Sequence, residues 1–158
     1  MTSPHFPNCF YRVTIKGLYV RDGKLLLLRE PTPDSDGGYW ELPGGGLDFG
    51  EDIRACLERE IEEEMRLNVL SVDQRPTYVW TTRFEDKRNL DWFYSLLLAY
   101  RIDFEHLEFT PTNECAAIGF FTREELATLP LKRQARGLIT HFDPADIEPG
   151  SVPLPELT

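Results

Sequence analysis

The sequence predicts a single mixed α/β domain that is built in layers. Segments that read as strands outnumber those that read as helices, and the strongest helical segment stands between two strand-rich halves. The chain has 158 residues, which is the size of one domain. We expect this domain to span residues 1–142, followed by a proline-rich C-terminal tail over residues 143–158.

The first third of the chain is expected to form short strands joined by tight turns. Asp22-Gly23 lies between two apolar runs, and an Asp-Gly pair in that setting is a strong hairpin signal. Residues 31–38 are rich in Pro, Asp and Gly, so they predict a loop. The strands expected here are Arg12–Val20, Lys24–Arg29 and Tyr39–Leu42, the last of which leads into glycines 44–46.

The rest of the chain begins with a helix and continues mainly with strands. The expected elements are a helix over Glu51–Met65, strands over Val69–Thr82, Asp91–Ile102 and Glu114–Phe121, and a helix over Leu131–Phe142. The charged stretch Arg83–Asn89 predicts a hairpin loop between two of these strands. Thr122 and Glu125 match a capping box, which predicts a short helix that ends at Pro130.

The charge of the chain is strongly acidic and unevenly distributed. There are 27 acidic and 17 basic residues, a formal net charge of −10, and residues 48–64 alone account for −6 of it. This balance argues against a nucleic-acid polymer or an anionic membrane as a partner, because both attract clustered Lys and Arg. Cys9, Cys56 and Cys115 are odd in number and widely spaced, which is typical of a reducing compartment, so we expect a cytoplasmic protein.

Helical periodicity turns two glutamates of the Glu51–Met65 segment toward its apolar face. At about 100° per residue, Glu60 and Glu64 fall in the middle of that face, and Glu63 lies at its edge. A carboxylate turned toward a core must be paired, protonated or bound to a cation. The remaining glutamates of the segment, which we expect to face water, are Glu58 and Glu62.

Three carboxylates at this spacing predict a cation site. Glu60, Glu63 and Glu64 are neighbours at i, i+3 and i+4, so they cannot all ionise comfortably without a counter-charge. Arg59 is the nearest base, and its spacing to Glu63 favours an ion pair between the two. Ligand sets made only of oxygen select a hard cation, so the sequence predicts Mg²⁺ or Mn²⁺.

The glycine-rich stretch before this helix is not a phosphate-binding P-loop. Gly45 and Gly50 have the P-loop spacing, but Glu51 and Asp52 stand where the motif requires Lys and Ser or Thr. Instead, Gly45, Glu51 and the run Arg59–Leu67 closely resemble the Nudix box, GX5EX7REUXEEXGU. The similarity in layout covers residues 11–142 and implies the Nudix fold, a mixed β-sheet sandwiched between helices (α/β/α).

One position departs from the box. Arg66 stands where the family has glycine, at the turn that leaves the helix. Glycine at such a position serves a left-handed C-cap, in which another residue costs about 1 kcal/mol. Every carboxylate of the box remains, so the departure bears on how the helix ends and not on its acids.

The resemblance to MutT-like Nudix hydrolases also implies roles for individual residues. Arg59 would orient the carboxylates, Glu51 would tether the loop to the helix, and Gly45 is the first glycine of the motif. The general base stays open between Glu60 and Glu114, because its position varies within the family. The implied metal ligands are the carboxylates of Glu60, Glu63 and Glu64 and the backbone carbonyl of Gly44.

The function implied by the resemblance is divalent-metal-dependent hydrolysis of a nucleoside diphosphate linked to another moiety, with water attacking phosphorus. We expect a small nucleotide substrate: a nucleoside triphosphate first, then a nucleotide sugar or a dinucleotide. The residues that bind the substrate are not identified by the sequence. The alternative is a non-catalytic Nudix-fold module that binds a nucleotide and regulates a partner, and the sequence also leaves a homodimer open.

Overall fold

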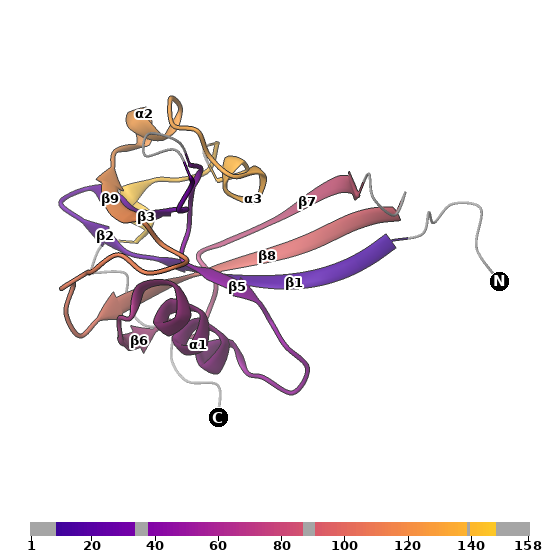
Figure 1. Cartoon of the computed structure of the whole chain (residues 1–158), viewed down its shortest axis with the longest axis horizontal. Helices are drawn as coiled ribbons and strands as arrows, with labels where there is room; N and C mark the ends of the chain where they lie inside the picture. Colours follow the sequence, from indigo (N-terminus) through magenta and orange to yellow (C-terminus); the bar gives the residue numbers. More distant parts are fainter. Residues whose placement is uncertain (1–8, 34–37, 87–90, 139, 148–158) are drawn as a thin grey trace.

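The computed structural model describes residues 9–33, 38–86, 91–138 and 140–147, whose strands form two sheets (Figure 1). The first sheet has the order β5–β1–β8–β6, with β7 also paired to β8. Its strands are β1 (Cys9–Leu18), β5 (Gly44–Gly46), β6 (Val69–Val72), β7 (Tyr78–Asp86) and β8 (Asp91–Phe104). In the second sheet β3 pairs with β2, β4 and β9. Its strands are β2 (Val20–Arg21), β3 (Lys24–Arg29), β4 (Trp40–Glu41) and β9 (Ala117–Phe121).

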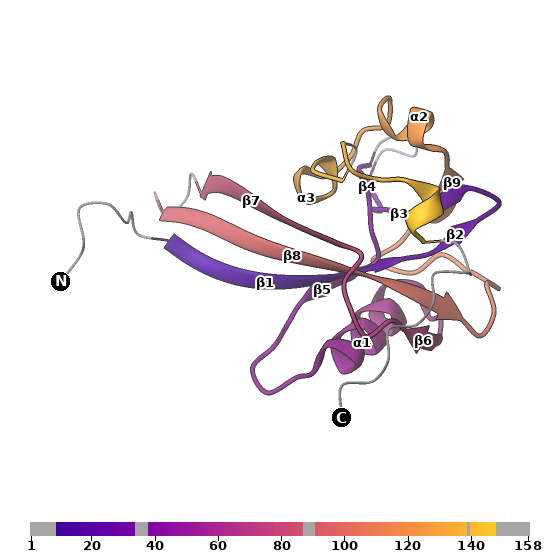
Figure 2. The same cartoon turned by 180° about the vertical axis from the view of Figure 1, so that it is seen from behind.

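Helices cover the strands from two sides, which confirms the predicted α/β/α arrangement. The helix α1 (Ile53–Met65) lies on one side, and α2 (Arg123–Leu126) and α3 (Arg133–Arg136) lie on the other (Figures 1 and 2). Each side buries its own core: Leu57 and Ile61 of α1 pack with Ile15 of β1, whereas Leu126 and Ala135 belong to the second cluster. In the described ranges, no helix is long and apolar enough to cross a membrane.

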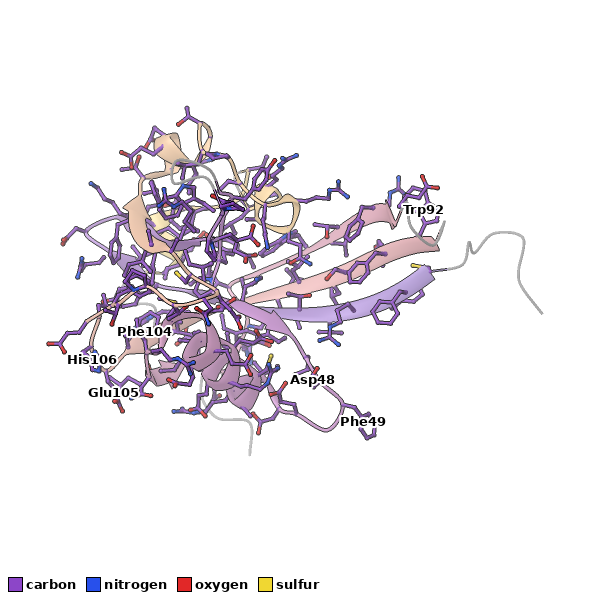
Figure 3. All side chains as sticks on the ribbon, viewed as in Figure 1. Asp48, Phe49, Trp92, Phe104, Glu105 and His106 are labelled. Atoms are coloured by element: carbon purple, nitrogen blue, oxygen red, sulfur yellow. The ribbon has the colours of Figure 1, made fainter. Side chains whose placement is uncertain are left out.

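Three strands continue beyond this layered body as an extended arm. β1, β8 and β7 run out together, and Trp92 lies near the far end of the arm (Figures 1 and 3). The arm corrects one prediction, because Arg83 and the residues up to Asp86 belong to β7 and not to a hairpin loop. Cross-strand pairing explains the difference: Phe84 stands opposite Phe93, and their rings stack with centroids 4.9 Å apart. Residues 87–89 of the predicted loop lie outside the described residues.

Several local predictions are confirmed. Asp22 and Gly23 both have positive φ, as the hairpin between β2 and β3 requires. The capping box is present, since the Thr122 side chain accepts from the Glu125 amide and the Glu125 side chain accepts from the Thr122 amide. Residues 34–37 of the predicted loop over 31–38 lie outside the described residues.

The predicted helix over Leu131–Phe142 is reduced to the four residues of α3. Leu131 forms a β-bridge with Trp40, and the Lys132 amide donates to the Trp40 carbonyl at 2.9 Å, so helix formation starts only after them. Gly137 then ends the helix against the side chain of Trp80. Contacts with distant segments therefore override the local helical pattern.

The packed part of the chain continues past residue 142, where we expected the domain to end. A 3₁₀ helix, η1 (Pro144–Asp146), follows, and Ile147 is only 3% exposed within the second core cluster. The Tyr78 hydroxyl accepts from the Asp143 amide at 3.0 Å and donates to the Asp146 carboxylate at 2.5 Å. Residues 148–158 of the predicted tail lie outside the described residues.

Candidate metal and active site

The site is built where the glycine strand β5 lies against α1. Gly44 has φ +114°, and a Cβ there would collide with the Ile15 carbonyl of the neighbouring strand. A Cβ on Gly45 would collide with the Glu60 carboxylate. Gly44 therefore lets the backbone of β5 approach β1, which a larger residue would prevent, whereas a larger residue at Gly45 would displace the Glu60 carboxylate.

α1 is capped at its start by a side chain and ends at a residue in the left-handed conformation. The Asp52 side chain caps the first turn by accepting from the Ala55 amide at 2.8 Å. At the other end Arg66 adopts the left-handed conformation, with φ 56° and ψ 33°. The backbone geometry that the box assigns to glycine is thus kept with arginine in its place.

The helix presents its glutamates as the periodicity predicted. Glu64 is 8% exposed, and its Oε2 accepts from the Gly44 amide at 3.0 Å. Glu60 lies over Gly45 and is partly buried, whereas Glu63 is about half exposed. Glu58 and Glu62 face solvent.

Burial dominates the electrostatics of Glu64. Desolvation raises the pKa of this carboxyl to about 8, against the lowering that comes from Lys16 and the Gly44 amide. The ionised form of Glu64 is therefore under-compensated by the groups around it. An additional positive charge on its open side would stabilise that form.

Arg59 joins the loop before α1 to the acidic face of the helix. Its guanidinium donates hydrogen bonds to both carboxylate oxygens of Glu51, from Nε to Oε1 at 2.7 Å and from Nη2 to Oε2 at 2.9 Å. Its Nη1 donates to Glu60 at 2.7 Å, while the contact with Glu63 is 3.5 Å long. The predicted pairing of Arg59 with Glu63 is therefore weaker than its pairings with Glu51 and Glu60, which lie in better positions for the planar guanidinium.

Glu51 connects this cluster to the loop. Its Oε2 accepts from the Asp48 amide at 3.1 Å, so one carboxylate bridges the loop backbone and Arg59. The hydrogen bond from Arg59 is the main reason that the pKa of Glu51 falls to about 2. Figure 3 shows Asp48 and Phe49 at the loop that projects from this region.

Glu114 lies next to the C-terminal end of α1, held there by Thr112. The Thr112 hydroxyl donates to the Glu64 carbonyl at 2.5 Å and accepts from the Glu114 amide at 3.2 Å. The Glu114 side chain is exposed. Sequence reasoning selected Glu114 but missed Thr112, because a single threonine 48 residues from its helical partner leaves no local pattern.

A second residue that the sequence did not indicate is Lys16 on β1. Its side chain is buried, and Nζ donates to the Gly44 carbonyl at 2.7 Å and to the Leu42 carbonyl at 3.1 Å. Glu41 lies 3.6 Å from the same Nζ. The carbonyl that the resemblance implies as a metal ligand therefore already has an ammonium group beside it.

The donors around β5 fit a hard cation in their chemistry. The groups that meet between β5 and α1 are the carboxylates of Glu60 and Glu64 and the backbone of Gly44 and Gly45, and carboxylate oxygens are ligands that Mg²⁺ and Mn²⁺ prefer. Within the described ranges, however, no three acidic, His or Cys side chains converge on one point. The physical reason lies in the contacts above: Glu60 turns to Arg59, Glu64 turns to the Gly44 amide, and Glu63 turns to solvent.

The aromatic side chains of the arm pack mainly with their neighbours. The Arg133 guanidinium lies 4.8 Å from the Phe84 ring centroid, and the Trp80 Nε1 donates to the Gln134 carbonyl at 2.8 Å. Trp92 is exposed, with the Arg83 guanidinium 5.9 Å from its ring centroid, and Phe10 and Tyr11 of β1 are exposed as well. Among the described residues of the arm, these contacts single out no one ring as a stacking site.

Comparison with known proteins identifies the class to which this fold and site belong. Residues 11–142 match the NUDIX domain family, so the chain belongs to that family. The matched range is also the range over which the sequence resembles a Nudix protein in its layout. The fold and the acidic helix described above are therefore those of a NUDIX domain.

The relatives and neighbours carry hydrolase names. A Mycobacterium tuberculosis protein named as a candidate 8-oxo-dGTP diphosphatase is 30% identical over 143 residues, which is 82% of this chain and 63% of that protein. The Escherichia coli CTP pyrophosphohydrolase is 37% identical over 51 residues, 32% of this chain and 38% of the enzyme. The matched segments thus span less than two thirds of these relatives.

Solved structures show the same fold. The MutT NUDIX hydrolase from Burkholderia pseudomallei has a TM-score of 0.61 and 27% identity, with 83% of this chain and 97% of that chain covered. The E. coli ORF135 protein has a TM-score of 0.64 at 23% identity, covering 82% and 86% of the two chains. The second likeness bears on the fold alone.

Proposed function

We propose that the protein is a divalent-metal-dependent pyrophosphohydrolase that cleaves a nucleoside diphosphate linked to another moiety. The observation that carries the proposal is the set of oxygen donors where β5 meets α1. There the buried carboxylate of Glu64 contacts the Gly44 amide, and Glu60 lies over Gly45. Membership of the NUDIX family supports the same activity.

The residues divide into those that hold a cation and those that keep them in place. Glu60, Glu63, Glu64 and the Gly44 carbonyl are the proposed ligands of Mg²⁺ or Mn²⁺. When bound, the cation would neutralise the pyrophosphate and lower the pKa of the attacking water. Arg59 holds Glu60 at 2.7 Å and Glu51 ties Arg59 to the loop, so both act on the position of the ligands.

The general base is proposed to be either Glu60 or Glu114. Glu60 already stands within the cluster of ligands, over the backbone of β5. Glu114 is exposed and reaches the end of α1 through the Thr112 contact, so it is free to meet a water at the phosphate. A base must lie within hydrogen-bond reach of that water, and its removal costs about 100-fold in rate or more.

The proposed substrate is a nucleoside triphosphate, with a nucleotide sugar or a dinucleotide as the other candidates. The names of the relatives, a candidate 8-oxo-dGTP diphosphatase and a CTP pyrophosphohydrolase, favour the triphosphate. The free cysteines favour a reducing compartment, in agreement with a cytoplasmic location. Burial raises the pKa of Cys56 to about 12, so this thiol is not a nucleophile at neutral pH.

The test is hydrolysis of a nucleotide panel with MgCl₂, with release of phosphate or pyrophosphate as the measurement. We expect turnover of at least one nucleoside triphosphate. Absence of turnover across the panel, together with retained nucleotide binding, would instead identify a non-catalytic Nudix-fold module. Comparison of the products assigns the bond that is cleaved.

Variants of the acids test their roles. We expect Glu63→Gln to lower kcat by about 100-fold, because loss of a metal ligand or its support typically costs 10–100-fold or more. Glu62→Gln is the matched control, since Glu62 is exposed on the same helix and points away from β5. Turnover of Glu63→Gln near the wild-type rate would remove Glu63 from the site, and an unaffected Glu114→Gln would remove Glu114.

A further inference from the structure

Lys16 is buried beside the candidate metal site, where a lysine needs a specific reason to lie. Only 4% of the surface of Lys16 is exposed, although a lysine is almost never fully buried unless it is paired. Nζ donates to two backbone carbonyls, Gly44 at 2.7 Å and Leu42 at 3.1 Å, and lies 3.6 Å from Glu41 Oε2. These contacts fix the ammonium group at the end of β5.

The two polar groups of Gly44 are thus held by opposite charges. Its amide donates to the Glu64 carboxylate at 3.0 Å, and its carbonyl accepts from Lys16. That carbonyl is also the oxygen that we propose as a metal ligand. A Mg²⁺ or Mn²⁺ ion on it, with a metal–oxygen bond of about 2.1 Å, would lie no more than about 5 Å from the Lys16 Nζ, given the 2.7 Å contact.

We infer that Lys16 is an internal counter-cation that shares the Gly44 carbonyl with the bound divalent metal ion and lowers the affinity of the site for it. The inference rests on the proposed function, because it takes the metal site as given. A single positive charge at this distance repels the divalent ion and offsets the attraction of Glu41 and Glu64. Removing it leaves these carboxylates with less compensation and a stronger attraction for the metal ion.

Nearby charges give the inference a matched control. Lys132 also lies close to Glu41, 3.4 Å from its other carboxylate oxygen, and contacts Glu30 as well. Lys132 lies near Oε1 of Glu41, whereas Lys16 lies near Oε2. Among the described residues, no hydrogen bond joins Lys132 to Gly44. Loss of the Lys132 charge therefore tests the general effect of removing a cation near Glu41.

The experiment measures Mn²⁺ binding to the full chain by isothermal titration calorimetry. Lys16→Gln keeps a donor for the carbonyls but removes the charge, and we expect it to bind Mn²⁺ about tenfold more tightly than the wild type. Lys16→Arg, which keeps the charge, and Lys132→Gln, which leaves the Gly44 carbonyl untouched, should each stay within about threefold of the wild type.

The outcomes distinguish failure of the proposed metal site from failure of this inference alone. If the wild type does not bind Mn²⁺, the proposed metal site fails and the inference fails with it. If the wild type binds but Lys16→Gln binds equally or more weakly, only the inference is overturned. If Lys16→Gln unfolds alone, we expect MnCl₂ to restore its circular dichroism spectrum, and a variant that stays unfolded with saturating MnCl₂ also overturns the inference.

Discussion

At the scale of single residues, the pairing of Glu51 with Arg59 organises the loop that leads into α1. The carboxylate receives two hydrogen bonds from the guanidinium and one from the Asp48 amide. Bidentate pairs of this kind are stronger than single contacts. The pKa of Arg59 is raised in turn by its hydrogen bonds to Glu51 and Glu60, so Arg59 stays charged at every pH at which the protein is folded.

The Glu51–Arg59 ion pair makes the free energy of unfolding depend on pH in the acid range. Because the pKa of Glu51 falls from 4.5 to about 2, the contribution of this carboxylate to the free energy of unfolding is fully present above pH 4.5. It is lost as the pH falls toward 2. We expect Glu51→Gln to be less stable than the wild type at neutral pH and to lose less stability across that window. Urea unfolding at a series of pH values measures the difference.

The matched control for this prediction is Glu58→Gln. Glu58 pairs with Arg54 at 2.7 Å on the exposed face of the same helix, where ion pairs contribute little. The control should follow the wild-type pH dependence closely. An acid dependence of Glu51→Gln that matches the wild type would show that the Glu51–Arg59 pair does not stabilise the fold.

At the scale of the element, α1 ends in a conformation that its sequence does not favour. Arg66 has φ 56°, a left-handed geometry that costs about 1 kcal/mol for a residue with a Cβ. Its amide donates to the Glu62 carbonyl at 3.1 Å, so the helix closes with the expected C-cap bond. The cost is borne by the backbone and not by the carboxylates of the site.

We expect Arg66→Gly to raise the free energy of unfolding by about 0.5–1 kcal/mol, because glycine adopts this conformation without strain. The loss of the exposed ion pair with Glu62, 3.4 Å long, subtracts a few tenths of a kcal/mol at most. Thermal and urea unfolding measure the change. Arg66→Ala, which loses the ion pair but keeps the strain, should not stabilise, and a gain equal to that of glycine would contradict the argument.

The elements also show where local patterns are reliable. The inward position of Glu64 and the outward position of Glu62 follow from helical periodicity, which depends only on neighbouring residues. β7 differs, because its charged end reads as a loop and becomes a strand only by pairing with β8. The segment after Leu131 differs in the opposite sense, since its helical pattern is interrupted by the bridge to Trp40.

At the scale of the whole molecule, the fold is closed by a segment that follows the region of family similarity. The match to the NUDIX family ends at residue 142, yet Asp143 and Asp146 bond to Tyr78 of β7, and Ile147 is buried. These contacts join the end of the described chain to the base of the arm. The packed body of the described chain therefore includes residues 143–147.

We expect a chain that ends at Phe142 to be less stable than one that ends at Ile147 by about 3 kcal/mol. The estimate combines the burial of one isoleucine, about 2 kcal/mol, with hydrogen bonds worth about 1 kcal/mol. Urea unfolding of the two truncated chains measures the difference. In the full chain, Ile147→Ala should lose about 2 kcal/mol, and equal stability of the two truncations would place the end of the fold at residue 142.

By itself the sequence determined the parts of this protein that depend on short-range spacing. The glycines 44–46, the acidic face of α1 and the family to which the chain belongs can all be read from residues 42–67. Only the tertiary structure decided which groups meet across that site: Lys16 at the Gly44 carbonyl, Thr112 at the end of α1, and Glu51 as the main partner of Arg59. Helical period is a local property, whereas a buried cation and its acceptor 28 residues away are brought together only by the pairing of strands.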